Sequence, residues 1–172
     1  MDDFGIMGQP WYDYKEQIHT INIGNGVTHI GRYAFFGTIG ITSIDIPNSV
    51  TSIGWYAFQY CTNLSSVTLP NSITSIEMET FVWCQSLTSI NIPDSVTKIG
   101  WGAFERCESL TSITLPNSVT SIGNQAFMSC FNLTSINIPD RARQKKLCKS
   151  RQATVKETGA NQVLACAEHR LT

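Results

Sequence analysis

"LTSITLPNSVTSIGNQAFMSCFN" (residues 110–132) contains the pattern that decides the fold of this chain. Apolar and polar residues alternate over 110–115, which is typical of a strand with one buried side. Pro116 ends that strand, because proline has no N–H to donate to a strand ladder. Residues 119–123 predict a second short extended segment, and Gly123 permits a bend. The apolar spacing over 126–130 favours a helical turn that closes one coil.

This unit recurs every 23 residues along the chain. Copies start at residues 18, 41, 64, 87 and 110, and a partial copy starts at 133. One coil cannot bury its apolar side chains alone, but stacked coils align equivalent residues in columns and pair their strands about 4.8 Å apart. Each buried Leu, Ile or Phe then contributes about 1.5–3 kcal/mol. The sequence therefore predicts a β-rich repeat solenoid with parallel strands and short helical or 3-10 turns.

The charge divides the chain into a solenoid and a tail. Residues 1–17 are expected to form an N-terminal cap segment, and residues 18–140 the solenoid. Residues 1–140 hold four Lys/Arg and eleven Asp/Glu, a formal net charge of −7. Residues 141–172 hold eight Lys/Arg and two Asp/Glu, a formal net charge of +6. The repeat pattern stops after Asp140, so the basic tail cannot continue the same columns.

Three interpretations of the tail remain open. Val163, Leu164, Ala167 and Leu171 follow a helical stripe, which predicts a helical cap over the last coil. The run of Lys/Arg over 141–156 instead favours a disordered arm that contacts anionic partners. The abrupt loss of the repeat's residue pattern is also consistent with a frame shift or a recombination event that replaced the end of the repeat.

The repeat resembles the BspA-like leucine-rich repeats, whose units also have 23 residues and follow the pattern LxxIxIPxxVxxIGxxAFxxC. The match covers about 18–140, and "QPWYDYKEQIHTINIGNGVTHIGRYAF" (9–35) resembles the family's N-terminal module. The resemblance implies a right-handed leucine-rich-repeat coil. It also implies a cell-surface or secreted protein of anaerobic bacteria or some protists, with a role in adhesion or protein–protein contact.

Two coils depart from the pattern. In coil 64–86, Glu77 stands at the glycine position and Thr80 at the alanine position. If the glycine needs a positive φ, glutamate is costly there, so either the bend needs no glycine or this coil is distorted. In the first coil, Gly24 replaces the proline and Thr38 the cysteine, as expected for an atypical terminal repeat.

The cysteines and histidines form no recognisable catalytic or metal-binding motif. Cys61, Cys84, Cys107 and Cys130 share one position of the repeat, one thiol per coil. A disulfide or metal ladder is one reading, but no close CxxC pair is present and stacked side chains rarely meet disulfide geometry. Buried small apolar residues are the expected role. His19, His29 and His169 lack a nearby nucleophile and acid, so no catalytic residue, metal site or cofactor is predicted.

The residue types that differ most from one coil to the next lie at the IGxxAFxxC corner, whereas the strand faces carry small polar residues. Tyr60, Trp83 and Arg106 share one repeat position and should stack on consecutive coils; Trp55, Met78 and Trp101 share another. Trp, Tyr and Arg are enriched at binding hot spots. The candidate interaction surface is therefore Trp55, Tyr56, Tyr60, Trp83, Trp101 and Arg106. The alternative is that these side chains only shield the core.

Composition excludes several classes of function. The near-neutral net charge of −1 argues against a specific nucleic-acid binder. The chain contains no run of about 18 apolar residues, so no membrane span is predicted. The acidic N-terminus does not resemble a signal peptide. The hypotheses are a non-enzymatic module that binds an unknown protein or glycan, or a structural spacer with no ligand of its own.

Overall fold

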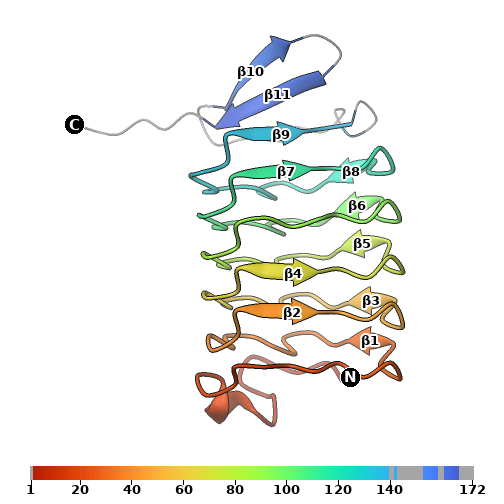
Figure 1. The fold of residues 1–172 in the computed structure, drawn as a ribbon, viewed down its shortest axis with the longest axis vertical. Helices are drawn as coiled ribbons and strands as arrows, with labels where there is room; N and C mark the ends of the chain where they lie inside the picture. The colour runs from red at the N-terminus through yellow and green to blue at the C-terminus, as the bar shows by residue number, and fades with distance from the viewer. Residues whose placement is uncertain (1, 140–141, 143–152, 159–160, 167–172) are drawn as a thin grey trace, which may run out of the picture.

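The computed structural model describes residues 2–139, 142, 153–158 and 161–166. It is a stack of coils in which short parallel strands lie across the long axis and pair from coil to coil along it, with very little helix (Figure 1). The elements, in chain order, are η1 (Tyr12–Tyr14), β1 (His29–Ile30), β2 (Ser43–Asp45), β3 (Ser52–Ile53), β4 (Ser66–Thr68), β5 (Ser75–Ile76), β6 (Lys98–Ile99), β7 (Ser112–Thr114), β8 (Ser121–Ile122), β9 (Ser135–Asn137), β10 (Ala153–Thr158) and β11 (Asn161–Cys166). The solenoid expected from the repeat is confirmed.

The first strands of four coils, β2, β4, β7 and β9, lie on one face of the stack, whereas residues 89–91 of coil 87–109 form no assigned strand, so β4 and β7 are not joined in one sheet. β2 pairs in parallel with β4, and β7 with β9, and each pair is offset by one full repeat, as in Ser43↔Ser66 and Ser112↔Ser135. The central isoleucine or valine of each strand is buried and its two polar neighbours point outward. The register of these strands is therefore fixed by the period of the sequence, because a slip by one residue would expose the buried side chain.

The second, shorter strands form another ladder behind the first. β1 pairs with β3, and β5, β6 and β8 form a three-stranded sheet. The glycine that follows each strand donates to the preceding coil: Gly100 N–H to Ile76 O at 2.7 Å and Gly123 N–H to Ile99 O at 2.8 Å. A Cβ on Gly100 would lie 2.6 Å from the backbone of residues 77 and 78. The glycine thus provides space for close approach and does not have a positive φ.

The second ladder opens where the glycine is missing. β3 and β5 are not paired, and among residues 2–139 no backbone hydrogen bond joins Glu77 to Ile53. The bond that Thr97 N–H makes to Thr74 O at 2.9 Å also has no counterpart, within this same range, between Thr74 and the coil before it. A side chain at position 77 needs the space that the glycines leave to the neighbouring backbone. We call this junction the Glu77 seam; coil 64–86 is therefore locally distorted.

The helical turn expected at the corner is not formed. Tyr56 and Tyr60 have φ values of 63° and 61°, which end any right-handed helix. Alternate N–H groups donate to the next coil, such as Phe58 N–H to Thr80 O at 3.0 Å, while Cys61 N–H donates within the coil to Phe58 O at 3.2 Å. The corner is a series of turns, because the hydrogen bonds between coils take the donors that a helix would use.

The core consists of stacked columns, as the repeat predicts. The phenylalanine column runs Phe35, Phe58, Phe81, Phe104 and Phe127, with successive ring centroids 5.3–5.5 Å apart. Leucine, isoleucine and valine columns lie beside it, and nearly all of their members are under 9 % exposed. Each coil therefore buries its side chains against the equivalent side chains of its neighbours.

The N-terminal residues cover the first coil. Trp11 stacks on Phe35 with centroids 6.0 Å apart, and its Nε1 donates to Ala34 O at 2.9 Å. Phe4 packs edge-on against Trp11, and its N–H donates to Arg32 O at 3.0 Å. These contacts extend the core columns by one aromatic ring at this end.

The C-terminal part differs from the helical cap considered above. β10 and β11 form an antiparallel hairpin, and Val163 of β11 is paired with Asn137 of β9 (Figure 1). Residues 161–166 are therefore a strand on the last coil, where a free strand edge offers unpaired backbone groups. The basic run over 143–152 and the end of the expected helical stripe, 167–172, lie outside the described residues. The domain limits at 17 and 140 remain predictions.

Candidate interaction surface

The six residues singled out at the corner are described together as the corner strip: Trp55, Tyr56, Tyr60, Trp83, Trp101 and Arg106. They occupy the turns between the second strand of each coil and its cysteine. Tyr56, Tyr60, Trp83 and Arg106 all have φ between 58° and 64°. The repeated pattern of hydrogen bonds between coils holds the backbone there, so these side chains project from a fixed, left-handed conformation.

Tyr60, Trp83 and Arg106 stack on consecutive coils, as their shared repeat position predicts. The rings of Tyr60 and Trp83 are 5.6 Å apart at an angle of 20°, and the Arg106 guanidinium carbon lies 4.4 Å from the Trp83 centroid. Phe36 packs edge-on against Tyr60 at 5.6 Å. Tyr60 is 39 % exposed, and Trp83 and Arg106 are half-buried. The column is ordered by its own contacts while its edges face solvent.

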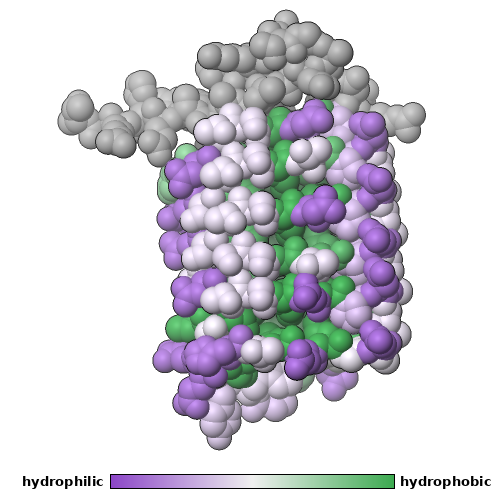
Figure 2. All heavy atoms as spheres, in the orientation of Figure 1, coloured by the Kyte–Doolittle hydropathy of each residue, from purple (hydrophilic) through white to green (hydrophobic). Residues whose placement is uncertain are grey.

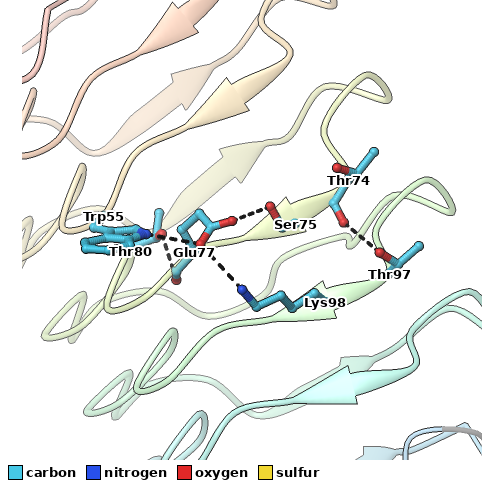
Figure 3. A network of polar contacts seen from close by, with 7 residues as sticks. All are labelled: Trp55, Thr74, Ser75, Glu77, Thr80, Thr97 and Lys98. Carbon is cyan, nitrogen blue, oxygen red and sulfur yellow. Dashed lines mark hydrogen bonds and ion pairs between the residues drawn. The ribbon is translucent and has the colours of Figure 1, made fainter.

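Trp55 is held from two sides. The Arg32 guanidinium carbon lies 5.2 Å from its ring centroid, and its Nε1 donates to Glu77 Oε2 at 3.2 Å. Glu77 also accepts from Ser75 Oγ at 2.6 Å and lies 3.9 Å from Lys98 Nζ (Figure 3). Its carboxylate therefore links three coils across the seam that its own backbone leaves open, and Trp55 stays 42 % exposed.

Tyr56 and Trp101 complete the strip in different ways. Tyr56 stacks on Tyr33 with centroids 4.7 Å apart and an interplanar angle of 4°, and burial raises the pKa of its hydroxyl. Trp101 is 41 % exposed, and within the described part of the chain its indole makes no ring stack or hydrogen bond. A ligand can therefore reach the exposed part of Trp101 without first breaking a ring stack or hydrogen bond among the described residues.

Two carboxyl groups lie beside the strip. A Cβ on Gly102 would be 3.0 Å from Glu79 Cγ and 3.4 Å from Glu105 Oε2, so both side chains converge over this glycine. Burial raises the pKa of both carboxyls, the Glu105 charge raises that of Glu79 further, and Arg106 lowers that of Glu105. Gln59 Nε2 donates to Glu79 Oε2 at 3.2 Å. The strip therefore combines aromatic rings with charges of both signs.

Arg32, Tyr33, Phe36 and Glu77 were not among the residues predicted for this surface. Arg32 and Tyr33 precede Trp55 and Tyr56 by one full repeat, so the spacing that predicted the stack of Tyr60, Trp83 and Arg106 could have found them. The tie between Trp55 and Glu77 could not be found this way. It depends on the side-chain rotamers of residues that occupy different repeat positions.

The four cysteines of the column are buried thiols. Each Sγ donates to the carbonyl of a phenylalanine in the preceding coil, as from Cys61 to Phe35 O at 3.1 Å and from Cys107 to Phe81 O at 3.2 Å. Burial raises the pKa of Cys61 to about 12, and that of Cys84 and Cys107 well above the usual value. Cys61, Cys84, Cys107 and Cys130 are buried and form no disulfide with one another, so the expected packing role is supported.

The histidines described by the structure make polar contacts at the surface. His19 Nδ1 lies 3.1 Å from Gly40 O, and His29 Nδ1 lies 2.6 Å from Ser52 Oγ. Within the described residues, no group of three or more His, Cys, Asp or Glu is placed to hold a metal ion. His169 lies outside the described residues.

The strand face is chemically uniform. Figure 2 shows regular columns of weakly polar residues beside a hydrophobic stripe on this side of the stack. Many of the hydroxyl groups bond internally, such as Thr134 Oγ1 to Thr111 O at 3.2 Å and Ser65 Oγ to Thr42 O at 3.0 Å. A groove of about 370 Å³ lies between residues 20–23 and 43–47, with Asp45 as its one ionisable lining residue. Neither feature presents a catalytic pair.

No helix in the described parts of the chain has the length and apolar character that crossing a membrane requires.

The family model described as "BspA type Leucine rich repeat region" matches residues 6–134 in six copies. The leucine-rich repeat protein of T. pallidum is 38 % identical, with a TM-score of 0.64, over 66 % of this chain and 53 % of its own length. A leucine-rich cell surface protein from Faecalibacterium prausnitzii is 40 % identical, with a TM-score of 0.65, over 66 % and 30 %.

A leucine-rich repeat protein from Eubacterium ventriosum aligns over more of the chain. It is 25 % identical, with a TM-score of 0.68, over 86 % of this chain and 41 % of its own. This chain thus spans about half, or less, of these solved relatives. No curated protein sequence matches it. The matched repeats and the solenoid of stacked, equivalent coils show that the chain belongs to the BspA-type leucine-rich repeat family.

Proposed function

We propose that this chain is a non-enzymatic binding module that holds a protein partner on its corner strip, at the cell surface. The observation that carries the proposal is the stacked column of Tyr60, Trp83 and Arg106, with Trp55 and Trp101 exposed beside it. Trp, Tyr and Arg are the residue types that dominate the binding energy of protein interfaces. Side chains that are already ordered lose less conformational freedom when a partner binds.

The rest of the molecule supports this choice of surface. The coils form a rigid scaffold of stacked core columns, and repeat proteins commonly present such extended surfaces to partners. The strand face offers small hydroxyl groups, many of which already bond to backbone. A surface location is consistent with the F. prausnitzii relative, which is described as a cell surface protein. The corner strip gathers several exposed aromatic side chains on neighbouring coils, whereas the exposed rings of Tyr14 and Phe131 lie outside it.

A random 12-residue peptide library, selected on the immobilised full chain, tests the proposal. Selected peptides should concentrate on the corner strip, because preordered aromatic surfaces are the easiest to bind. Their affinity should fall at least about tenfold for Trp83→Ala and also fall for Trp101→Ala, which removes no ring stack or hydrogen bond of the described residues. Ser112→Ala on the strand face is the matched control and should leave affinity unchanged. Peptides that bind wild type and both tryptophan variants equally, or no selected peptides at all, would support a structural spacer instead.

A further inference from the structure

Both arginines of residues 1–140 stack on tryptophans of the corner strip. Arg106 lies 4.4 Å from the centroid of Trp83, and Arg32 lies 5.2 Å from that of Trp55 and 5.6 Å from that of Tyr33. Neither guanidinium forms an ion pair with a described residue. Nor does either guanidinium donate a hydrogen bond to a described residue; the carboxylate of Glu105 interacts with the guanidinium of Arg106, and that of Asp3 with the guanidinium of Arg32, only through their charges.

Stacking prepares a guanidinium for one kind of ligand. The ring covers one face of the planar group and fixes its orientation, while the N–H donors at its edge remain available. Those donors match the two oxygens of a carboxylate, and the paired hydrogen bonds are among the strongest in proteins. Since the arginine is already ordered, a carboxylate that binds it incurs a smaller entropic cost.

The other charges of the corner narrow the class of ligand. Glu77, Glu79 and Glu105 lie on the same corner as the two arginines. A uniformly anionic polymer would meet these three carboxylates and be repelled, because like charges at an interface are unfavourable. A protein segment can place an acidic residue at each arginine and an apolar or basic residue elsewhere. The distribution of charge therefore favours a protein over a polyanionic glycan.

We propose that the corner strip recognises an extended protein segment through its acidic residues, one bound by Arg106 and one by Arg32, with an apolar side chain against the tryptophans between them. This rests on the proposed function of the strip. The arginines are three coils apart, about 14 Å along the stack at about 4.8 Å per coil, and they occupy different repeat positions, so a segment that reaches both crosses the stack obliquely. An extended segment covers the axial part of that distance in about four residues, since a strand rises about 3.3 Å per residue.

The peptides selected on the full chain test this inference separately from the binding itself. Those that depend on Trp83 should be enriched in Asp or Glu, with acidic pairs about four or more positions apart. Their affinity should fall about tenfold for Arg106→Gln and recover only in part for Arg106→Lys, because lysine lacks the planar pair of donors. Lys15→Gln is the matched control. Lys15 also stacks on an aromatic ring, Tyr12, at 4.1 Å but lies outside the strip, so affinity should not change.

Raising the salt concentration should weaken the acidic peptides more than any neutral ones, because exposed charges are screened. Heparin, used as a uniform polyanion, should not displace the peptides. Trp83-dependent peptides without acidic residues, an unchanged affinity for Arg106→Gln, or displacement by heparin would each overturn the inference while leaving binding at the strip intact. The absence of any Trp83-dependent peptide would contradict the proposed function itself.

Discussion

The guanidinium of Arg106 lies 4.4 Å from the centroid of the Trp83 ring, one coil away along the stack. The opposite neighbour of Trp83 is Tyr60, whose ring is 5.6 Å away. Three side chains from three coils thus form one ordered column at equivalent positions of successive repeats. The period that stacks the core also arranges this exposed chemistry.

The contact between Arg106 and Trp83 should be measurable as a coupling energy. A double-mutant cycle of Trp83→Ala and Arg106→Ala is expected to give about 0.5–1 kcal/mol, the usual range for an exposed cation–π pair. Arg106 and Trp101 show no such contact, so a cycle between these two residues serves as the control. Chemical unfolding measures both cycles. Equal coupling energies in the two cycles would show that the stack does not stabilise the native state.

The Glu77 seam should exchange its amide hydrogens faster than other junctions. The amides of Gly100 and Gly123 donate to the preceding coil at 2.7 and 2.8 Å and should be protected. The amide of Glu77, which has no such bond among the described residues, should exchange faster. Glu77→Gly should slow exchange at position 77, because the coils can then approach. Equal protection at all three positions in the wild-type protein would show that the ladder is continuous.

Gly100→Ala should have the opposite effect at the next junction. The added methyl group would lie 2.6 Å from backbone atoms of residues 77 and 78, so the coils must separate. Overpacking of this kind typically costs about 1–3 kcal/mol. Gly26→Ala is the control, because a Cβ there meets nothing within 4 Å. A Gly100→Ala protein as stable as the wild type in urea would contradict the role assigned to these glycines.

Replacing Gln125 with glycine should stabilise the protein, because residue 125 has a left-handed backbone conformation. Gln125 has a φ of 60° and is exposed, a conformation that costs an L-residue about 1–2 kcal/mol. Gln125→Gly should therefore raise the free energy of unfolding, offset in part by the greater freedom of glycine in the unfolded chain. The adjacent Asn124 is also exposed but has no positive φ, so Asn124→Gly should lower stability. The same change in stability at both positions would contradict the strain argument.

The cysteine column should be unreactive in the native protein. In a Cys148→Ser/Cys166→Ser background, a thiol reagent at pH 8 should label no cysteine until the protein unfolds. The folded pKa of Cys61 is about 12, compared with 9.0 for a free thiol. The neutral Cys61 thiol therefore contributes its full stabilisation below pH 9. This stabilisation is lost as the pH rises toward 12, because the thiol loses its proton at a lower pH in the unfolded chain than in the folded protein. Rapid labelling at pH 8 would show that the column is accessible.

The sequence predicted the columns well because one period controls them all. The stacked phenylalanines, the buried thiols and the alignment of Tyr60, Trp83 and Arg106 follow from spacing alone. Where the prediction was wrong, hydrogen bonds decided the structure. Alternate corner amides donate to the next coil, so the turn near Phe58 is not helical. The glycines were attributed to backbone conformation, although close contact between coils requires them.

Side-chain contacts between different columns could not be read from the period. The bond from Trp55 to Glu77 joins two repeat positions, and it exists because one coil lacks the usual glycine. The pairing of β11 with β9 lies beyond the last full repeat, where no pattern indicates the partner of a strand. Such features depend on rotamers and on local exceptions rather than on the repeat.

The indole N–H resonances of the four tryptophans offer the most direct test of the corner strip as a binding surface. Trp55, Trp83 and Trp101 belong to the strip, whereas Trp11 packs at the N-terminal end with its Nε1 bonded to Ala34 O. Titration of the ¹⁵N-labelled full chain with a selected peptide should shift the three strip resonances in a saturable way, Trp83 most, and leave Trp11 unchanged. Saturable binding that shifts only Trp11, or none of the four, would contradict the assignment of the corner strip as the binding surface.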